Sequence, residues 1–506
     1  MSDGVAASGT GTEMGTEMGA DTGDGAATRP LVFDLDGTLI RADTTFELCV
    51  QHVKAYPLTG AVQLFRWFLA SKESAKTELA RRHGTAVDPE HLPWSDLTGH
   101  EIFRAAPVRA LVSGSADPVV QRIGEHLGGF AHVRGTGDGV NMIGPDKARH
   151  LTETYPDGFD YVGDSRADIP VWHAAGRAYA ANASRGTIEA ARAEGIDLEV
   201  ISQQPGAMRA ILKGMRLHQW AKNGLIAVVP LLNLAIFQPV WAIELLLGFI
   251  AFGLVASATY LFNDLLDIPA DRAHRTKRAR PFAAGDLPIP KGCQAIAGLG
   301  GAGFVLALLL DPGFAAMLVL YTAVSLAYSF QLKRIMALDV IVLAFLFCLR
   351  VLAGAVLVGL ETNMWFMLSL GFFFFGLALG KRAIELAGKQ ATASIGPGEN
   401  VLIRGRGYVA RDLSVVMGAG LASSFVTVLI VAIYALLSRS AVIEHEAAGA
   451  AIVAILTFWQ TRFWLLVGRD EVHDDPIIFA LKDRLSALTL ALLGVVVVFE
   501  QLWPRA

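Results

Sequence analysis

The chain has 506 residues, of which 53% are hydrophobic, and a formal net charge of −4. This length suffices for two or three domains, and the mildly acidic balance gives no reason to expect a nucleic-acid partner. The three cysteines are far apart and show no metal-ligand spacing, so we interpret them as reduced and structural.

Residues 1–30 are rich in glycine, alanine, threonine and acidic side chains and contain the duplicated stretch TEMGTEMG. The segment lacks the basic start and the apolar core of a signal peptide, so we do not assign it that function. It also lacks the apolar residues that a packed core requires. We therefore predict a disordered tail over residues 1–30.

Residues 31–205 have the composition of a soluble protein, and polar side chains follow several of the short apolar runs. The stretches that carry them are LVFDLDGT, RALVSGSAD, IGPDKARHL and FDYVGDSRAD. An α/β sheet forms its ligand crevice at the ends of such runs. The side chains that we expect there are Asp34, Asp36, Ser113, Lys147, Asp164 and Asp168.

These residue types suit the hydrolysis of a phosphate ester. One carboxylate attacks phosphorus, and a second carboxylate two residues further along exchanges a proton with the leaving oxygen. A distant pair of carboxylates anchors Mg²⁺, while a hydroxyl and an ammonium group bind the phosphoryl oxygens.

The order of these motifs resembles that of the haloacid dehalogenase phosphatase superfamily. The resemblance implies an α/β (Rossmannoid) domain over residues 31–205 with phosphatase activity. We interpret the stretch between Asp43 and about Ala106 as a helical cap that chooses the substrate. The alternative is an inactive domain that binds phosphorylated ligands and regulates the other half of the chain.

The same resemblance implies roles for individual residues of the α/β domain. Asp34 corresponds to the nucleophile and Asp36 to the acid/base. Ser113 and Lys147 correspond to the phosphate binders, with Ser115 as an alternative hydroxyl. The implied Mg²⁺ ligands are Asp34, Asp36, Asp164 and Asp168.

Residues 206–222 join the two halves of the chain. Apolar side chains such as Met208 and Leu212 alternate there with basic ones such as Arg209 and Lys213. This pattern predicts an amphipathic helix on the cytoplasmic membrane face. A simple snorkelling anchor for the first membrane span is the alternative.

Residues 223–506 contain long apolar runs of the length that a membrane helix needs. Basic residues concentrate in alternate loops, which the positive-inside rule assigns to the cytoplasm. We therefore predict an all-α polytopic domain in the plasma (inner) membrane, with the N-terminal domain and both sites facing the cytoplasm. The nine predicted spans are 223–238, 241–262, 292–311, 313–330, 338–359, 364–380, 414–437, 447–467 and 485–503.

The loop after the second predicted span begins with LFNDLLDIPADRAHRTKRARPFAAG. Asp264, Asp267 and Asp271 are spaced i, i+3, i+7 and share one face of a continued helix, although Pro269 is expected to kink it. Carboxylates this close repel one another unless a cation lies among them, and Mg²⁺ suits such ligands together with phosphate. A diphosphate-sized cluster is completed by Asn263, His274, Lys277, Arg278 and Arg280.

This stretch closely resembles the first aspartate-rich motif of the UbiA superfamily, NDxxDxxxDxxHxxKxxRPxxxG. The resemblance implies a membrane-embedded, Mg²⁺-dependent transferase that holds a diphosphate leaving group. It implies catalytic roles for Asp264 and Asp267, and metal contacts by both and by Asp271. The implied substrate contacts are Asn263, Asp271, Lys277, Arg278 and Arg280.

After the sixth predicted span, GKRAIEL replaces the second acidic motif of the ubiquinone-pathway members. Two other motifs accompany it: QWAKN before the first predicted span and DDPIIFALKD before the last. Together the three motifs resemble the polyprenyl-phosphate phosphoribosyltransferase branch of the family. That branch moves 5-phosphoribosyl from phosphoribosyl diphosphate to a lipid phosphate, and these anions call for basic partners. The predicted substrate contacts are Lys222, Lys333, Lys381, Arg382 and Glu385. Two alternative roles are open for three further carboxylates: they bind ribose hydroxyls, or they bind a second metal ion. These residues are Asp474, Asp475 and Asp483.

Together these motifs predict a bifunctional membrane enzyme that acts on a polyprenyl phosphate lipid, with the phosphatase removing the 5-phosphate of the transferase product. One alternative is a UbiA prenyltransferase that moves a polyprenyl group from its diphosphate to an aromatic or other small acceptor. Another is a transporter, which is expected to carry charged residues in the middle of its spans. Arg350 in the fifth span is the main candidate for such a residue. The lipid length and the oligomeric state do not follow from the sequence.

Overall fold

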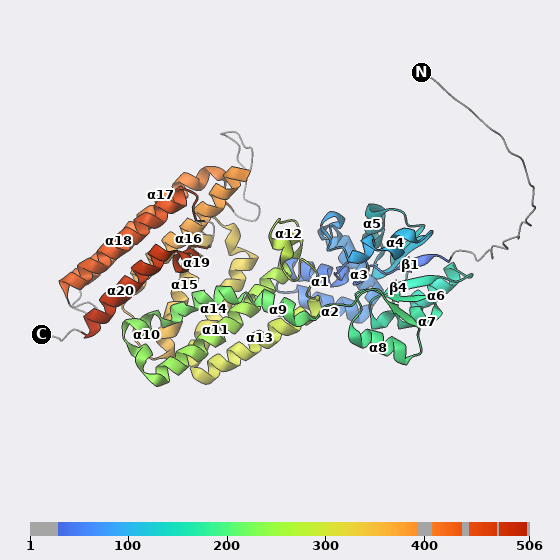
Figure 1. The fold of residues 1–506 in the computed structure, drawn as a ribbon, viewed down its shortest axis with the longest axis horizontal. Helices are drawn as coiled ribbons and strands as arrows, with labels where there is room; N and C mark the ends of the chain where they lie inside the picture. The colour runs from blue at the N-terminus through green and yellow to red at the C-terminus, as the bar shows by residue number, and fades with distance from the viewer. Residues whose placement is uncertain (1–28, 393–406, 438–444, 473–474, 503–506) are drawn as a thin grey trace, which may run out of the picture.

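The computed structural model describes residues 29–392, 407–437, 445–472 and 475–502. An α/β domain lies at one end of the molecule and a long helical bundle at the other, with α1 and α2 of the α/β domain nearest the bundle (Figure 1). Apart from its last two residues, the predicted tail 1–30 lies outside the described residues.

The α/β domain is built on six parallel strands in the order β3-β2-β1-β4-β5-β6. The strand order reverses at β1, which has β2 on one side and β4 on the other. Parallel sheets of this kind bind ligands at the carboxyl ends of the strands that flank such a reversal. The α/β fold predicted for this half is confirmed. The strands are β1 (Leu31–Phe33), β2 (Arg109–Ala116), β3 (His132–Thr136), β4 (Asp160–Gly163), β5 (Ala178–Ala180) and β6 (Leu198–Val200).

Apolar cores lie on both faces of this sheet. Val32 and Phe33 are adjacent in β1 but belong to separate buried clusters, because successive side chains of a strand point to opposite faces. The helices that follow β2 pack over these clusters: α5 (Asp117–Leu127), α6 (Pro145–Thr154), α7 (Ile169–Ala174) and α8 (Arg185–Ala193).

The stretch predicted as a cap is helical, as expected. Asp43 caps its first helix by accepting a hydrogen bond from the backbone N–H of Phe46, and Ser71 caps its third helix in the same way. Whether this cap chooses the substrate stays a prediction. The helices are α1 (Thr44–Ala55), α2 (Gly60–Ala70), α3 (Lys72–His83) and α4 (Glu101–Ala105).

The predicted amphipathic helix is shorter than expected. α9 (Ala207–Met215) exposes Met208 and Leu212 and buries Ala210. It ends at Arg216, which adopts a left-handed φ of 51°, and 3₁₀ turns follow over Leu217–Ala227. The change of direction brings the residues after α9 back against the helical bundle.

The range 223–238 does not form one membrane helix, so that predicted span is wrong. The chain there makes 3₁₀ turns, then α10 (Val228–Leu232), and then a 3₁₀ turn over Ala235–Phe237. Leu234, at a left-handed φ of 53°, interrupts the path between the last two. A residue in this conformation cannot continue a right-handed helix.

Seven helices of the described residues are long and apolar enough to cross a membrane. They coincide with the second to eighth predicted spans, except that the sixth extends well beyond residue 380. They are α11 (Pro239–Leu266), α13 (Ile289–Leu310), α14 (Pro312–Phe330), α15 (Leu338–Leu357), α16 (Met364–Thr392), α17 (Leu413–Leu437) and α18 (Glu446–Gly468). The range of the last predicted span is occupied by α20 (Arg484–Leu502), after the short α19 (Pro476–Lys482).

The cap of the α/β domain contacts the membrane half directly. The guanidinium of Arg272 donates to both carboxylate oxygens of Glu47 in α1, at 2.8 and 2.5 Å, and both side chains are buried. Lys54 Nζ donates to the carbonyl oxygen of Leu266 at 2.7 Å. Val50 of α1 packs against an apolar cluster of the membrane half. The two halves therefore share a specific interface.

Candidate active sites

Three carboxylates of the α/β domain converge at the carboxyl ends of β1 and β4. Oxygen atoms of Asp34, Asp164 and Asp168 lie within 4.8 Å of one another. Asp34 follows β1 and Asp164 follows β4, and the direct pairing of these strands brings the two together. Gly37 permits the close approach, because its φ is 77° and a Cβ there would lie 2.2 Å from Asp164 Oδ2.

This group of carboxylates fits a hard divalent cation. Burial, and then the charges of Asp168 and Asp34, raise the pKa of Asp164 well above its usual value. A cation that prefers oxygen ligands offsets this repulsion. Three of the four predicted metal ligands are thus brought together, whereas the carboxylate of Asp36 hydrogen-bonds elsewhere.

Lys147 lies at the centre of the same site. Its Nζ is 3.1 Å from Asp34 Oδ1 and 3.6 Å from Asp168 Oδ1, and it donates to the hydroxyl of Tyr161 at 2.8 Å. Burial disfavours its charge, but Asp34 and Asp168 outweigh burial and raise the pKa of Lys147. The ammonium is therefore charged and close to the candidate nucleophile.

Asp36 is held on the cap side of the site. Its Oδ1 accepts from the backbone N–H of Thr44 at 2.9 Å, and its Oδ2 accepts from the hydroxyl of Ser115. Burial, and then the charge of Asp43, raise the pKa of Asp36 to about 7. Burial raises the pKa of Asp34 to about 6, against the lowering effect of Lys147. A carboxyl with a pKa near neutrality suits proton exchange at physiological pH.

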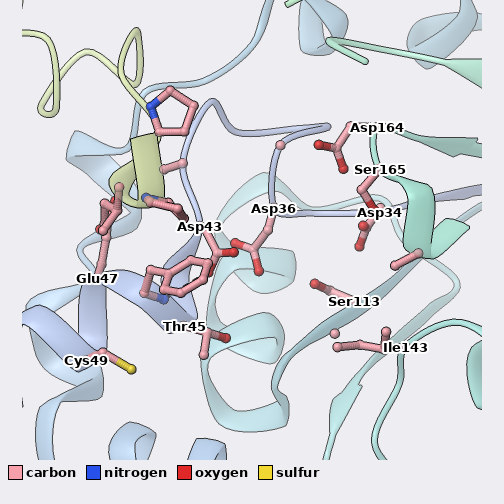
Figure 2. A pocket seen from close by; sticks show the side chains of 18 of the residues that line it. Asp34, Asp36, Asp43, Thr45, Glu47, Cys49, Ser113, Ile143, Asp164 and Ser165 are labelled. Carbon is pink, nitrogen blue, oxygen red and sulfur yellow. Dashed lines mark hydrogen bonds between the residues drawn. The ribbon is translucent and has the colours of Figure 1, made fainter. Parts of the chain in front are cut away.

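The two candidate hydroxyls have different positions. Ser113 lines the cavity beside Asp34 and Asp36 (Figure 2). Ser115 is directed to Asp36 and to the hydroxyls of Thr44 and Thr45. The arrangement favours Ser113 as the phosphate contact and gives Ser115 the task of orienting Asp36.

These residues line a cavity of about 990 Å³. Apolar side chains of α2, including Phe65, Phe68 and Leu69, form part of its wall. Another part comes from the membrane half, where Phe282 and residues 285–290 lead into α13. This segment is the yellow-green ribbon beside Asp43 in Figure 2. The candidate phosphatase site is thus enclosed by both halves of the chain.

The acidic motif of the membrane half does not form one continuous helix. α11 ends at Leu266 and the short α12 (Ile268–Arg272) contains Pro269 near its start, so the expected kink is present. Asp264 and Asp271 both contact Arg280, whose Nη1 lies 3.0 and 2.7 Å from their carboxylates. Arg216 forms a second ion pair with Asp264. These two carboxylates therefore share one cationic partner.

Asp267 has partners of its own. Its Oδ1 accepts from Lys54 Nζ at 2.9 Å and its Oδ2 from Lys333 Nζ at 3.3 Å. Burial acts to raise the pKa of Asp267, but Lys333 and Lys54 outweigh it and lower the pKa. Lys333 is thus brought to the acidic motif, as its predicted role requires.

Two buried oxygen atoms of this motif fit a role as cation ligands. Within the described residues, Asn263 Oδ1 and Asp264 Oδ2 are buried and have no hydrogen-bond partner. A buried acceptor that lacks a partner is costly, and one that faces a cation is not. The donor set therefore suits Mg²⁺ held between carboxylates and a diphosphate.

A second charged cluster lies around Asp475. Its Oδ2 accepts from Lys222 Nζ at 2.8 Å and from Lys381 Nζ at 3.0 Å. Burial acts to raise the pKa of Asp475, but the two lysines outweigh it and lower the pKa to about 2. Burial, and then the charge of Lys381, lower the pKa of Lys222 to about 8. Two cations thus share one carboxylate, which favours an additional anion here.

The remaining predicted contacts are dispersed. Arg382 is buried and pairs with Asp339 and with Glu385, each at 2.5 Å, so these predicted substrate contacts belong to an internal ion network. Lys277 and Arg278 are exposed on a turn after α12. Asp483 pairs with Arg462 at 2.6 Å, and Asp474 lies outside the described residues.

Two residues near these sites, Lys54 and Arg216, were not predicted from the sequence. Lys54 is distant in sequence from the acidic motif and belongs to no motif, so nothing marked it. Arg216 was recognised only as part of the interfacial segment. Arg350 is buried and donates to Asn223, Tyr321 and the backbone of its own helix, so its charge is hydrogen-bonded within the bundle. This accounts for the one mid-span charge that suggested a transporter.

Comparisons with known proteins agree with this arrangement. Residues 225–482 match the UbiA prenyltransferase family, and residues 31–173 match the haloacid dehalogenase-like hydrolases. The "Uncharacterized protein y4nM" of Sinorhizobium fredii is 37% identical over 472 residues, which are 92% of this chain and 90% of that protein.

Two further relatives match shorter parts of the chain. The decaprenyl-phosphate phosphoribosyltransferase of Mycobacterium tuberculosis is 36% identical over 193 residues, which are 37% of this chain and 64% of that enzyme. The nodulation protein NoeC of Azorhizobium caulinodans is 30% identical over 290 residues, which are 56% of this chain and 91% of that protein. The chain is therefore an integral membrane enzyme of the UbiA prenyltransferase family that also carries a haloacid dehalogenase-like hydrolase domain.

Proposed function

We propose that the membrane half transfers 5-phosphoribosyl from phosphoribosyl diphosphate to a polyprenyl phosphate. The α/β domain then removes the 5-phosphate from the lipid product. Both sites face the cytoplasm at the inner membrane, and both use Mg²⁺. Joining the sites in one chain keeps the second at a high effective concentration beside the product of the first.

The observation that carries the transferase assignment is the convergence of Lys222 and Lys381 on Asp475. A prenyl diphosphate with a neutral acceptor brings anionic charge only to the acidic motif. A phosphoribosyl donor and a lipid phosphate bring further phosphate groups, which require cations at a second place. The similarity to the M. tuberculosis enzyme supports the same choice.

In the proposed transfer, an oxygen of the lipid phosphate attacks the anomeric carbon of the ribose. The bond from that carbon to the diphosphate oxygen breaks, and diphosphate leaves with the bonding electrons. Asn263, Asp264, Asp267 and Asp271 would hold Mg²⁺, which supplies neutralisation of the leaving group. Lys222 and Lys381 bind the additional phosphate oxygens in competition with Asp475. Positioning and charge neutralisation supply most of the acceleration.

In the proposed hydrolysis, Asp34 attacks the phosphorus atom while Asp36 gives its proton to the departing ester oxygen. Asp36 then takes a proton from water, which attacks the phosphorus, releases phosphate and restores Asp34. The pKa of about 7 for Asp36 supports this exchange at neutral pH. Lys147 and Ser113 bind the phosphoryl oxygens, and Asp34, Asp164 and Asp168 would hold Mg²⁺.

The test uses membranes that contain the full chain, Mg²⁺, labelled phosphoribosyl diphosphate and a polyprenyl phosphate. The intact protein is expected to yield lipid-linked ribose, and Asp34→Asn to yield lipid-linked phosphoribose. Asp267→Asn is the transferase control and is expected to yield neither lipid. If the intact, folded protein labels no lipid, the phosphoribosyl assignment is wrong, and prenyl diphosphates with aromatic acceptors become the substrates to test.

A further inference from the structure

The cap helix α2 carries an exposed apolar stripe. Leu58 lies in the turn before α2, and Val62, Phe65 and Leu69 follow within the helix at a spacing that places these three on one face. The exposed fractions of the four side chains are 95%, 60%, 69% and 75%. Four large exposed apolar side chains within residues 58–69 are more than the scattered exposure of an ordinary soluble surface.

The helix before α2 is bonded to the end of one membrane helix, and the end of α2 lines a cavity together with the start of another. Lys54, four residues before Leu58, donates to the carbonyl of Leu266, the last residue of α11. Four residues span at most about 14 Å, so Leu58 lies near the level at which that helix leaves the membrane. At the other end, Leu69 lines the same cavity as Ile289, the first residue of α13. Figure 1 shows α2 on the side of the α/β domain nearest the bundle.

The surroundings of the stripe match a lipid surface. α9 lies against α11 and α13 and exposes its own apolar residues, Met208 and Leu212. Arg66 of α2 and Arg209 of α9 are exposed beside these apolar side chains. Apolar rows flanked by basic residues are typical of helices that lie in the headgroup region of an anionic leaflet.

We propose that the stripe Leu58–Val62–Phe65–Leu69 lies in the cytoplasmic leaflet and forms the membrane-side entrance to the candidate phosphatase site. Phe65 and Leu69 belong both to the stripe and to the cavity wall, so the apolar surface runs from the leaflet toward Asp34. The segment 285–290 of the membrane half forms another wall of this cavity. The site therefore takes a phosphomonoester whose apolar part stays in the membrane.

The segment 285–290 is held at the cavity by close packing. Gly285 has a φ of 74°, and a Cβ there would lie 2.0 Å from the carbonyl oxygen of Arg41. Asp286 is 3.8 Å from the guanidinium of Arg41. The cavity wall thus depends on docking of the two halves, and a soluble fragment of the α/β domain would lack it.

The first test measures the position of the stripe directly. Val62→Cys is made in a Cys293→Ser background, because Cys293 is exposed, and is labelled with an environment-sensitive fluorophore in anionic liposomes. Lipids with a nitroxide near the headgroup are expected to quench it at a depth of about 5–10 Å. Glu125→Cys, exposed on α5, is the matched control and is expected to remain unquenched. Equal weak quenching at both positions overturns the proposal, and so does a shielded but unquenched Val62→Cys label, which indicates a protein partner.

The second test concerns substrate access and rests on the proposed phosphatase function. Leu58→Asn with Val62→Asn alters the stripe at positions outside the cavity lining. Hydrolysis of the membrane-held lipid product is expected to fall about tenfold, because apolar burial in the leaflet is lost. Hydrolysis of the soluble ester p-nitrophenyl phosphate should be unchanged. If the double variant hydrolyses the lipid product as fast as the unaltered protein does, or if its rates on the two substrates fall equally, the proposed entrance is wrong. If the unaltered protein hydrolyses neither ester while the Val62→Cys label is quenched, the phosphatase assignment fails and the leaflet contact stands.

Discussion

Lys54 of the α/β domain forms an ion pair with Asp267 of the membrane half, with 2.9 Å between Nζ and Oδ1. Asp267 belongs to the acidic motif at which we place the diphosphate, and Lys333 is its second partner. The soluble half thus supplies a cation to the candidate transferase site. In return, residues 285–290 of the membrane half enclose the candidate phosphatase site. Each half contributes to the site of the other.

Replacing Lys54 by glutamine is expected to weaken binding of the diphosphate substrate. The ammonium neutralises the motif and orients Asp267, and loss of a hydrogen bond to a charged group costs about 1.5–3 kcal/mol, or roughly a tenfold to hundredfold rise in KM. Steady-state kinetics in membranes measures this change. Lys291→Gln, at an exposed lysine near the start of α13, is the matched control. An unchanged KM in Lys54→Gln would show that the pair serves docking alone.

The buried pair of Glu47 and Arg272 is expected to hold the halves together. Arg272→Met leaves a buried carboxylate without its partner, which costs about 3–5 kcal/mol. The amides of α1 should then exchange hydrogen faster in the full chain, because the docked interface opens more often. The double variant with Glu47→Met should recover part of the protection. Arg278→Met, at an exposed arginine, is the control, and similar exchange in both single variants argues against this role.

The transferase is expected to lose activity in mild alkali. The pKa of Lys222 is lowered to about 8, so its ammonium is present below that pH and is lost as the pH rises through it. We therefore expect kcat/KM for phosphoribosyl diphosphate to decline above about pH 8, since kcat/KM reports ionisations of the free enzyme. Lys222→Arg keeps the charge and should remove the decline. A decline that persists in this variant must come from another group.

Gly37→Ala is expected to inactivate the phosphatase selectively. The new Cβ would meet Asp164 Oδ2 at 2.2 Å and displace it from Asp34. A shift of about 1 Å in a catalytic group can cost about a hundredfold in rate. Gly139→Ala is the matched control, because Gly139 has a similar φ of 80° but nothing within 4 Å of a Cβ. The transferase rate should be unchanged in both variants, and equal phosphatase rates would contradict the steric argument.

Much of this architecture could be predicted from the sequence, because the relevant forces are local. Length and hydropathy located seven spans, since a membrane helix must satisfy its backbone hydrogen bonds within one apolar segment. The order of short apolar runs and acidic residues predicted the α/β sheet, where the pairing of β1 with β4 brings Asp34 and Asp164 together. The predicted span at 223–238 was wrong because hydropathy contains no information on backbone conformation, and Leu234 there is left-handed.

The partners of the charged residues were decided only by the tertiary structure. The spacing of Asp264, Asp267 and Asp271 suggested one shared face, yet the break before Pro269 leaves the first and third with Arg280 and the second with Lys54 and Lys333. Lys54 lies more than 200 residues from Asp267 in the chain. Ion pairing depends on distance in space, and apolar packing between the two halves sets that distance. The sequence therefore determined which chemical groups are present, and the docking of the halves determined which site each one serves.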